Sequence, residues 1–118
     1  MARLTPLQLL SFAFVLLSST AAAPEPAQVI EVHARRYDFE PSSINVKLGE
    51  TIRLRLISDD VPHSLLISGL GINEAASKSH PGEVVFTASK VGDFDGRCGR
   101  FCGSGHGRMH FTLHVIKN

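Results

Sequence analysis

The chain has no tryptophan and a single tyrosine among its 118 residues. A broad aromatic surface for stacking nucleic-acid bases is therefore not expected. Charge of one sign is not in excess either, because 12 basic residues stand against 11 acidic ones. Arg3 lies in a separate N-terminal segment, and without it the chain is neutral. A neutral domain argues against nucleic acid or an anionic membrane as the main partner.

Long apolar runs are also scarce, and the clearest one, LLSFAFVLLSSTAAA, comes shortly after Arg3. A positive start, a short apolar core and small residues at its end are typical of a secretory signal. The core is too short for a firm prediction of a membrane span. We expect residues 1–22 to be a signal peptide or an uncleaved anchor, and residues 23–28 to be a Pro-rich linker. Residues 29–118 would then form one domain in the periplasm or outside the cell.

Long helical patterns are missing from residues 29–118, where the apolar segments have the period of strands. Ile52, Leu54 and Leu56 alternate with polar residues, and residues 110–116 alternate in the same way. Residues 72–79 could form one helical turn. Further strands are expected at residues 29–39, with a bulge-like break near Arg35 and Arg36, and at residues 44–48, 63–68 and 83–88. The pattern predicts an all-β fold, a Greek-key β-sandwich of about seven or eight strands.

Cysteine is limited to Cys98 and Cys102, both within the segment CGRFCGSGHGRM. Two cysteines in an exported protein form a disulfide by default. A bond that closes so short a loop would add little stability, however. Iron–sulfur clusters normally need four cysteines, and the spacing differs from the CxxC of zinc knuckles. The pair is therefore better explained by another metal.

The same segment adds an imidazole and a thioether at His106 and Met109. Thiolate and thioether are soft ligands that suit copper, and imidazole suits copper as well. Two bridging thiolates call for one more ligand, and His63, in DDVPHSLLI, follows a turn at the start of a predicted strand. Glycines around the cysteines fit a loop folded tightly around an ion. The remaining histidines are expected to be surface residues: His33, His80, His110 and His114.

These residues together resemble a known site. His63 in DVPHS, followed by Cys98-x3-Cys102-x3-His106-x2-Met109 before the last strand, is similar to the dinuclear copper A domain. That cupredoxin domain occurs in cytochrome c oxidase subunit II and in nitrous oxide reductase. The resemblance implies two copper ions bridged by both thiolates, with one histidine on each ion and methionine as a weak axial ligand.

The sixth ligand implied by the resemblance is the backbone carbonyl of Arg100, at a position where the family normally has Glu. The chain also shows neither the two-helix membrane hairpin nor the Trp-containing cluster of the oxidase subunit. The resemblance therefore implies a free-standing, non-catalytic electron carrier. Its redox partner would be a protein such as a cytochrome or a terminal oxidase or reductase. Arg97, Arg100 and Arg108 would form either a docking rim or a solvated edge.

Two other functions stay open on the sequence. The same ligands could serve a copper carrier that delivers the ion to an oxidase or another cuproprotein. Alternatively, the loop could hold only a disulfide between Cys98 and Cys102, with no metal.

Overall fold

A computed structural model describes residues 15–20 and 28–118 of the chain. The predicted signal peptide and linker lie largely outside these residues. Residues 15–20 are exposed and adopt neither helix nor strand. Within the described part, no helix has the length and apolar character needed to cross a membrane.

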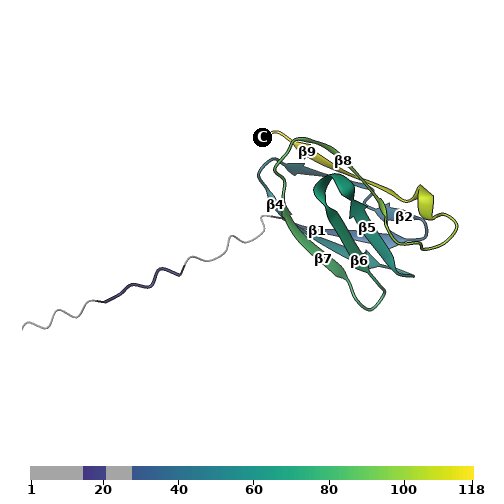
Figure 1. Ribbon diagram of the computed structural model, residues 1–118, viewed down its shortest axis with the longest axis horizontal. Coiled ribbons are helices and arrows are strands. Elements are labelled where there is room, and N and C mark those ends of the chain that lie inside the picture. The colour runs from purple at the N-terminus through teal and green to yellow at the C-terminus, as the bar shows by residue number, and fades with distance from the viewer. Residues whose placement is uncertain (1–14, 21–27) are drawn as a thin grey trace, which may run out of the picture.

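The domain is a sandwich of two β-sheets (Figure 1). The strand order is β2-β1-β4-β7 in one sheet and β3-β9-β8-β5-β6 in the other. The described residues contain nine strands and two 3-10 turns, with no α-helix. Their bounds are β1 Gln28–Arg35, β2 Asp38–Glu40, β3 Ser43–Lys47, β4 Thr51–Ser58, β5 His63–Ile67, η1 Ser68–Leu70, β6 Ile72–Ala76, β7 Gly82–Thr87, β8 Gly92–Cys98, η2 His106–Arg108 and β9 His110–Ile116.

Alternating side chains build the core between the sheets, as the sequence predicted. In β4, Ile52 and Leu54 are fully buried, whereas Arg55 points to solvent. In β9, Phe111 and Leu113 are buried, and the ring of Phe111 meets that of Phe39 edge to face with centroids 6.2 Å apart. This packing fixes the register of both sheets, because a slip by one residue would expose the apolar set.

Three details of the predicted fold are corrected. Ile72–Ala76 is a strand and not a helical turn, because it pairs along its whole length with β5. Gly92–Cys98 is a strand that the sequence did not predict, and it pairs with β9. The break near Arg35 is a hairpin turn between β1 and β2, not a bulge. The all-β sandwich itself is confirmed, with nine strands in place of seven or eight.

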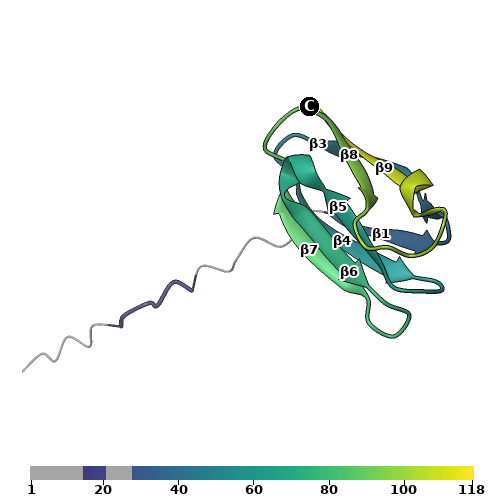
Figure 2. The same cartoon turned by 45° about the vertical axis from the view of Figure 1, so that its right-hand side comes forward.

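The loop between β8 and β9 crosses one end of the sandwich, where the β1–β2 turn and the β4–β5 connection also lie (Figure 2). Parallel pairing of β3 with β9 and antiparallel pairing of β8 with β9 anchor both ends of this loop. A rigid scaffold therefore carries the segment that the sequence marked as a candidate site.

Candidate metal centre

Two of the predicted ligands sit on neighbouring strands. His63 is the first residue of β5 and Cys98 is the last residue of β8. The strands pair so that Leu65 lies opposite Cys98. His63 Nδ1 is 3.9 Å from Cys98 Sγ, and both side chains are buried. We call these two residues the strand half of the site.

Three further predicted ligands come from the β8–β9 loop, and we call them the loop half. Cys102 lies at their centre. Its Sγ is 3.7 Å from His106 Nδ1 and 3.5 Å from Met109 Sδ. The same sulfur is 3.7 Å from Cys98 Sγ, so the two halves meet at the thiols. Cys102 and Met109 are buried and His106 is half-buried.

The backbone carbonyl of Arg100 completes the set. It accepts a hydrogen bond from the Cys98 thiol over 3.0 Å, while the arginine side chain is exposed. All six predicted ligand positions are thus brought to one place. Among the described residues, the cluster of His, Cys, Asp and Glu able to hold a metal consists of His63, Cys98 and Cys102.

Asp60 orients His63, a role that the sequence reading missed. Its carboxylate is 2.7 Å from His63 Nε2 and accepts the backbone N–H of Arg36 over 2.8 Å and that of Val61 over 2.6 Å. With Nε2 as the donor, Nδ1 is left free to bind a metal. Burial opposes ionisation of Asp60, but these hydrogen bonds outweigh it and lower its pKa to about 2. The spacing of Asp60 three residues before His63 was the available signal.

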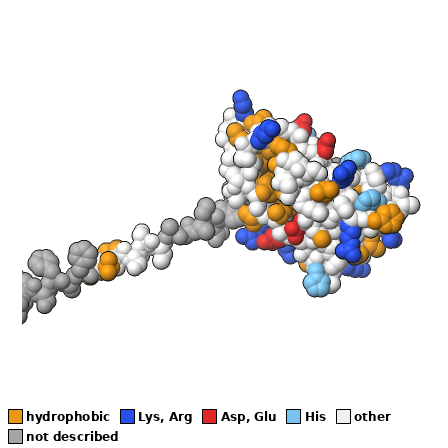
Figure 3. All heavy atoms as spheres, in the orientation of Figure 1, with side chains coloured by type: hydrophobic (Ala, Val, Ile, Leu, Met, Phe, Trp, Pro, Cys, Tyr) orange, Lys and Arg blue, Asp and Glu red, His pale blue; other side chains and the backbone are white. Residues whose placement is uncertain are grey.

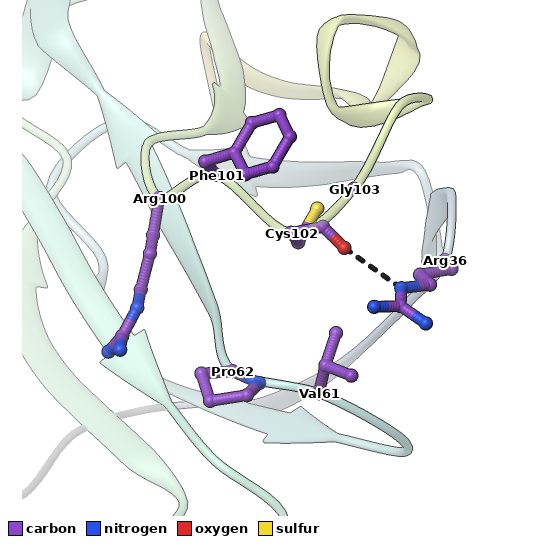
Figure 4. Close-up of a pocket in the computed structure, with 7 residues that line it drawn as sticks. All are labelled: Arg36, Val61, Pro62, Arg100, Phe101, Cys102 and Gly103. Atoms are coloured by element: carbon purple, nitrogen blue, oxygen red, sulfur yellow. Dashed lines mark hydrogen bonds between the residues drawn. The ribbon is translucent and has the colours of Figure 1, made fainter.

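The β1–β2 turn holds the loop half in place. Arg36 Nε donates to the carbonyl oxygen of Cys102 over 2.8 Å (Figure 4). Tyr37, the only tyrosine, packs against Gly103 and Gly105, and a Cβ at either glycine would collide with its ring. Gly103 also has a φ of 140°, which other residues rarely adopt.

The two thiols are free and close together. Burial, and then the neighbouring Cys98 thiol, raise the pKa of Cys102. A thiol in this setting ionises when a positive ion takes the place of its proton. The donors that meet here are two sulfurs of cysteine, one of methionine, two imidazole nitrogens and a carbonyl oxygen. Soft and borderline donors of this kind fit copper, so the residues present agree with the predicted cofactor.

The other histidines lie outside this cluster, as expected. His80 and His110 are exposed, and His33 and His114 are half-buried. His33 and His114 make hydrogen bonds to surface carboxylates, His33 to Asp59 and Glu31, and His114 to Asp93.

Comparison with known proteins places the chain in a family. The Cupredoxin-like domain family matches residues 7–109, so the chain belongs to the cupredoxin-like family. It is 33% identical over 73 residues to cytochrome c oxidase subunit 2 of Myxine glutinosa, covering 62% of this chain and 32% of that protein. It is 29% identical over 86 residues to cytochrome c oxidase subunit 2 of Thermus thermophilus, covering 73% of this chain and 64% of that protein.

The chain therefore spans between about a third and just under two thirds of the length of these relatives. Among solved structures, it is similar to the periplasmic domain of subunit II of cytochrome oxidase from Bradyrhizobium japonicum. The TM-score is 0.73 at 19% identity, over 82% of this chain and 89% of that one. The fold is thus shared with that domain, and the homology to oxidase subunit II comes from the sequence matches.

Proposed function

We propose that the protein is an electron carrier whose dinuclear copper site is formed by His63, Cys98, the carbonyl of Arg100, Cys102, His106 and Met109. The observation that carries this proposal is the approach of two buried thiols to 3.7 Å, with a histidine nitrogen beside each. Two thiolates at that spacing are suited to bridge two ions. When bound, copper would supply one-electron transfer.

The surrounding residues favour electron transfer over catalysis. Asp60 fixes the ring of His63, and Arg36 fixes the carbonyl of Cys102, so the ligands need little rearrangement when the charge changes. The buried side chains exclude water from the thiols. The titratable side chains of the site are assigned to the metal or to holding its ligands, and we propose that the protein has no catalytic activity of its own.

Copper delivery is the weaker alternative. A carrier that hands its ion to another protein needs ligands that the acceptor can reach. Here Cys98, Cys102 and Met109 are 2%, 5% and 0% exposed. His106, which is half-buried, is the most accessible ligand side chain. An electron can leave through such an edge, whereas a copper ion would require the loop to open.

We also propose that the protein works in an exported compartment, apart from an oxidase complex. The leader pattern after Arg3 supports export. The position between the cysteines holds Arg100, where the resemblance to the oxidase domain would place Glu. The resemblance implies that this Glu faces the catalytic subunit of the oxidase and contributes to a magnesium site at the interface, a role that an arginine cannot fill. The proposed partner is therefore a separate redox protein, such as a cytochrome or a terminal oxidase or reductase.

A copper titration of the reduced protein tests this function. We expect two copper ions per chain and the purple colour and electron paramagnetic resonance signal of a mixed-valence pair. Cys98→Ser and Cys102→Ser should each abolish that signal, because one thiolate cannot bridge as two do. Ser79→Ala, in the exposed β6–β7 turn, is the control. One ion per chain with an ordinary mononuclear signal would refute the dinuclear site.

A further inference from the structure

The most exposed large hydrophobic side chain of the folded domain lies inside the ligand loop. Phe101 is 77% exposed, although its neighbour Cys102 is buried. Its ring lies 5.6 Å from the ring of His106, the most accessible predicted ligand. Aromatic residues, phenylalanine among them, are enriched at protein interfaces relative to the rest of the surface. It also offers a short route from the site to the surface.

Two hollows lie beside the metal centre, and Phe101 lines the first of them. One cavity of about 250 Å³ lies beside Cys102, with Arg36 and Arg100 on opposite walls (Figure 4). A second cavity of about 440 Å³ lies beside His106 and is lined by Arg97 and His110. Cations thus line each hollow next to the metal centre.

The surface around these hollows is positive. Residues 96–112 include three arginines and no acidic residue. Figure 3 shows basic and histidine side chains gathered at the end of the molecule away from the N-terminal segment. Asp38 at this end is paired with Arg35, and Asp60 is hydrogen-bonded to His63. Among the described residues, no ion pair involves Arg97, Arg100 or Arg108.

We propose that this end of the molecule is a docking surface for a redox partner protein with an acidic face. The partner's apolar centre covers Phe101, and its carboxylates enter the two arginine-lined hollows. One electron passes between the reduced and the oxidised protein through His106 and Phe101, with no atom or proton transferred. The proposal rests on the proposed function and specifies its partner. The positive charge of the arginines on this surface would repel a partner with a basic docking face.

Electron exchange with two cytochromes of opposite surface charge tests the docking surface. The probes are a c-type cytochrome with an acidic haem edge and one with a basic haem edge. Stopped-flow rates of the copper-loaded full chain are compared at about 0.01 M and about 1 M ionic strength, where charges are screened beyond about 30 Å and about 3 Å. At low salt the acidic cytochrome should react at least about tenfold faster than the basic one, and the difference should vanish at high salt.

Charge-reversal variants show which residues cause the preference for the acidic cytochrome. Arg97→Glu with Arg100→Glu, one arginine in each hollow, should slow the acidic cytochrome at least about tenfold at low salt and speed the basic one. The control is Lys47→Glu with Lys90→Glu, the same change of net charge at the other end of the sheets. Phe101→Ser should slow exchange at both salt concentrations, because its contribution is apolar. Equal rates with both cytochromes, or the same loss in the control, would overturn the proposal.

A measurement of binding distinguishes failure of the docking surface from failure of the proposed electron transfer. In the reduced, metal-free chain, the acidic cytochrome should shift amide resonances around Phe101 and Arg108. Copper-loaded protein that reacts with neither cytochrome nor ferricyanide would refute electron transfer. Protein that reacts with ferricyanide but shows no preference for the acidic cytochrome would refute the docking surface alone. Arginine-dependent binding to anionic phospholipid vesicles, without that preference, would replace the protein partner with a membrane and overturn the proposal.

Discussion

The strand half and the loop half of the site are held in different ways. His63 and Cys98 terminate paired strands, and their separation follows from the register of β5 and β8. Cys102, His106 and Met109 lie in a loop, and their positions depend on Arg36 and Tyr37 of the β1–β2 turn. Strand pairing thus places the residues of one half, with Asp60 orienting the ring of His63. The other half needs a clamp from more than 60 residues earlier in the chain.

This difference predicts where the site is vulnerable. Changes at the β1–β2 turn should disturb copper binding more than the sandwich, because the contacts of the turn with the loop lie beside the metal site and not between paired strands. Changes that weaken the strand half should instead act through the stability of the fold. The following experiments test that division.

Oxidation should have the largest effect, because it joins the two halves directly. Cys98 and Cys102 have their sulfurs 3.7 Å apart, and a disulfide needs about 2.05 Å. We expect metal-free protein isolated in air to carry this bond and to take up no copper until it is reduced. Thiol titration followed by copper counting measures both states. Prompt copper uptake by thiol-negative protein would contradict the prediction.

Gly105→Ala should have the next largest effect and act on the loop half. The added methyl would collide with the ring of Tyr37, so the loop must shift away from the cysteines. We expect most of the copper to be lost and a destabilisation of about 1–3 kcal/mol, as in other overpacked sites. Gly107→Ala is a matched control, because nothing lies within 4 Å of its added Cβ. Equal copper content in both variants would show that Tyr37 does not position the loop.

Arg36→Met should weaken copper binding by about tenfold without affecting the fold, since outer partners of metal ligands typically contribute about 10–100-fold. The change removes the hydrogen bond to the Cys102 carbonyl. Arg35→Met, at the end of β1 beside the turn, is the control, because Arg35 makes only exposed ion pairs with Asp38 and Asp59 that contribute little. Competition with a copper chelator measures the affinities. The clamp would be refuted if the two variants bound copper equally well.

The strands that could be predicted from the sequence were those with clear alternation, such as β4 and β9. β6 was misread because Glu74 and Ala75 favour helix locally, and only pairing with β5 makes the segment a strand. β8 was missed because Gly92, Asp93 and Gly96 are poor strand formers. Pairing with β9 over six residues overrides that preference.

The candidate site likewise has a part that could be predicted from the sequence and a part that could not. The ligands could be named from residue types and spacing, because metal chemistry restricts which donors occur together. The supporting contacts could not, since they depend on which loops the sandwich brings together. Arg36 lies 66 residues before Cys102 in the chain, and no local pattern connects the two. Asp60 was the exception that its spacing from His63 could have revealed.

The smallest expected effect concerns the strand half and its dependence on pH. His33 on β1 is hydrogen-bonded to Asp59, the residue before Asp60, and to Glu31. The bond to Asp59 first, and then that to Glu31, raise the pKa of His33 above 6.5. The folded state therefore favours the protonated ring. Its stabilising contribution is fully present below pH 6.5 and is lost as the pH rises through the raised pKa.

Urea unfolding of the reduced, metal-free protein on both sides of this range measures the contribution. We expect the free energy of unfolding to fall slightly between about pH 6 and about pH 8.5, and His33→Asn to reduce that fall. The effect should be small because the side chain of His33 is 39% exposed and solvent screens its ion pairs. His80→Asn, in the exposed β6–β7 turn, is the control. If His33→Asn left the pH dependence of unfolding unchanged, His33 would not be its source. If His33→Asn lowered copper affinity as much as Arg36→Met, the strand half would depend on contacts outside the paired strands as strongly as the loop half does, and the division between the halves would fail.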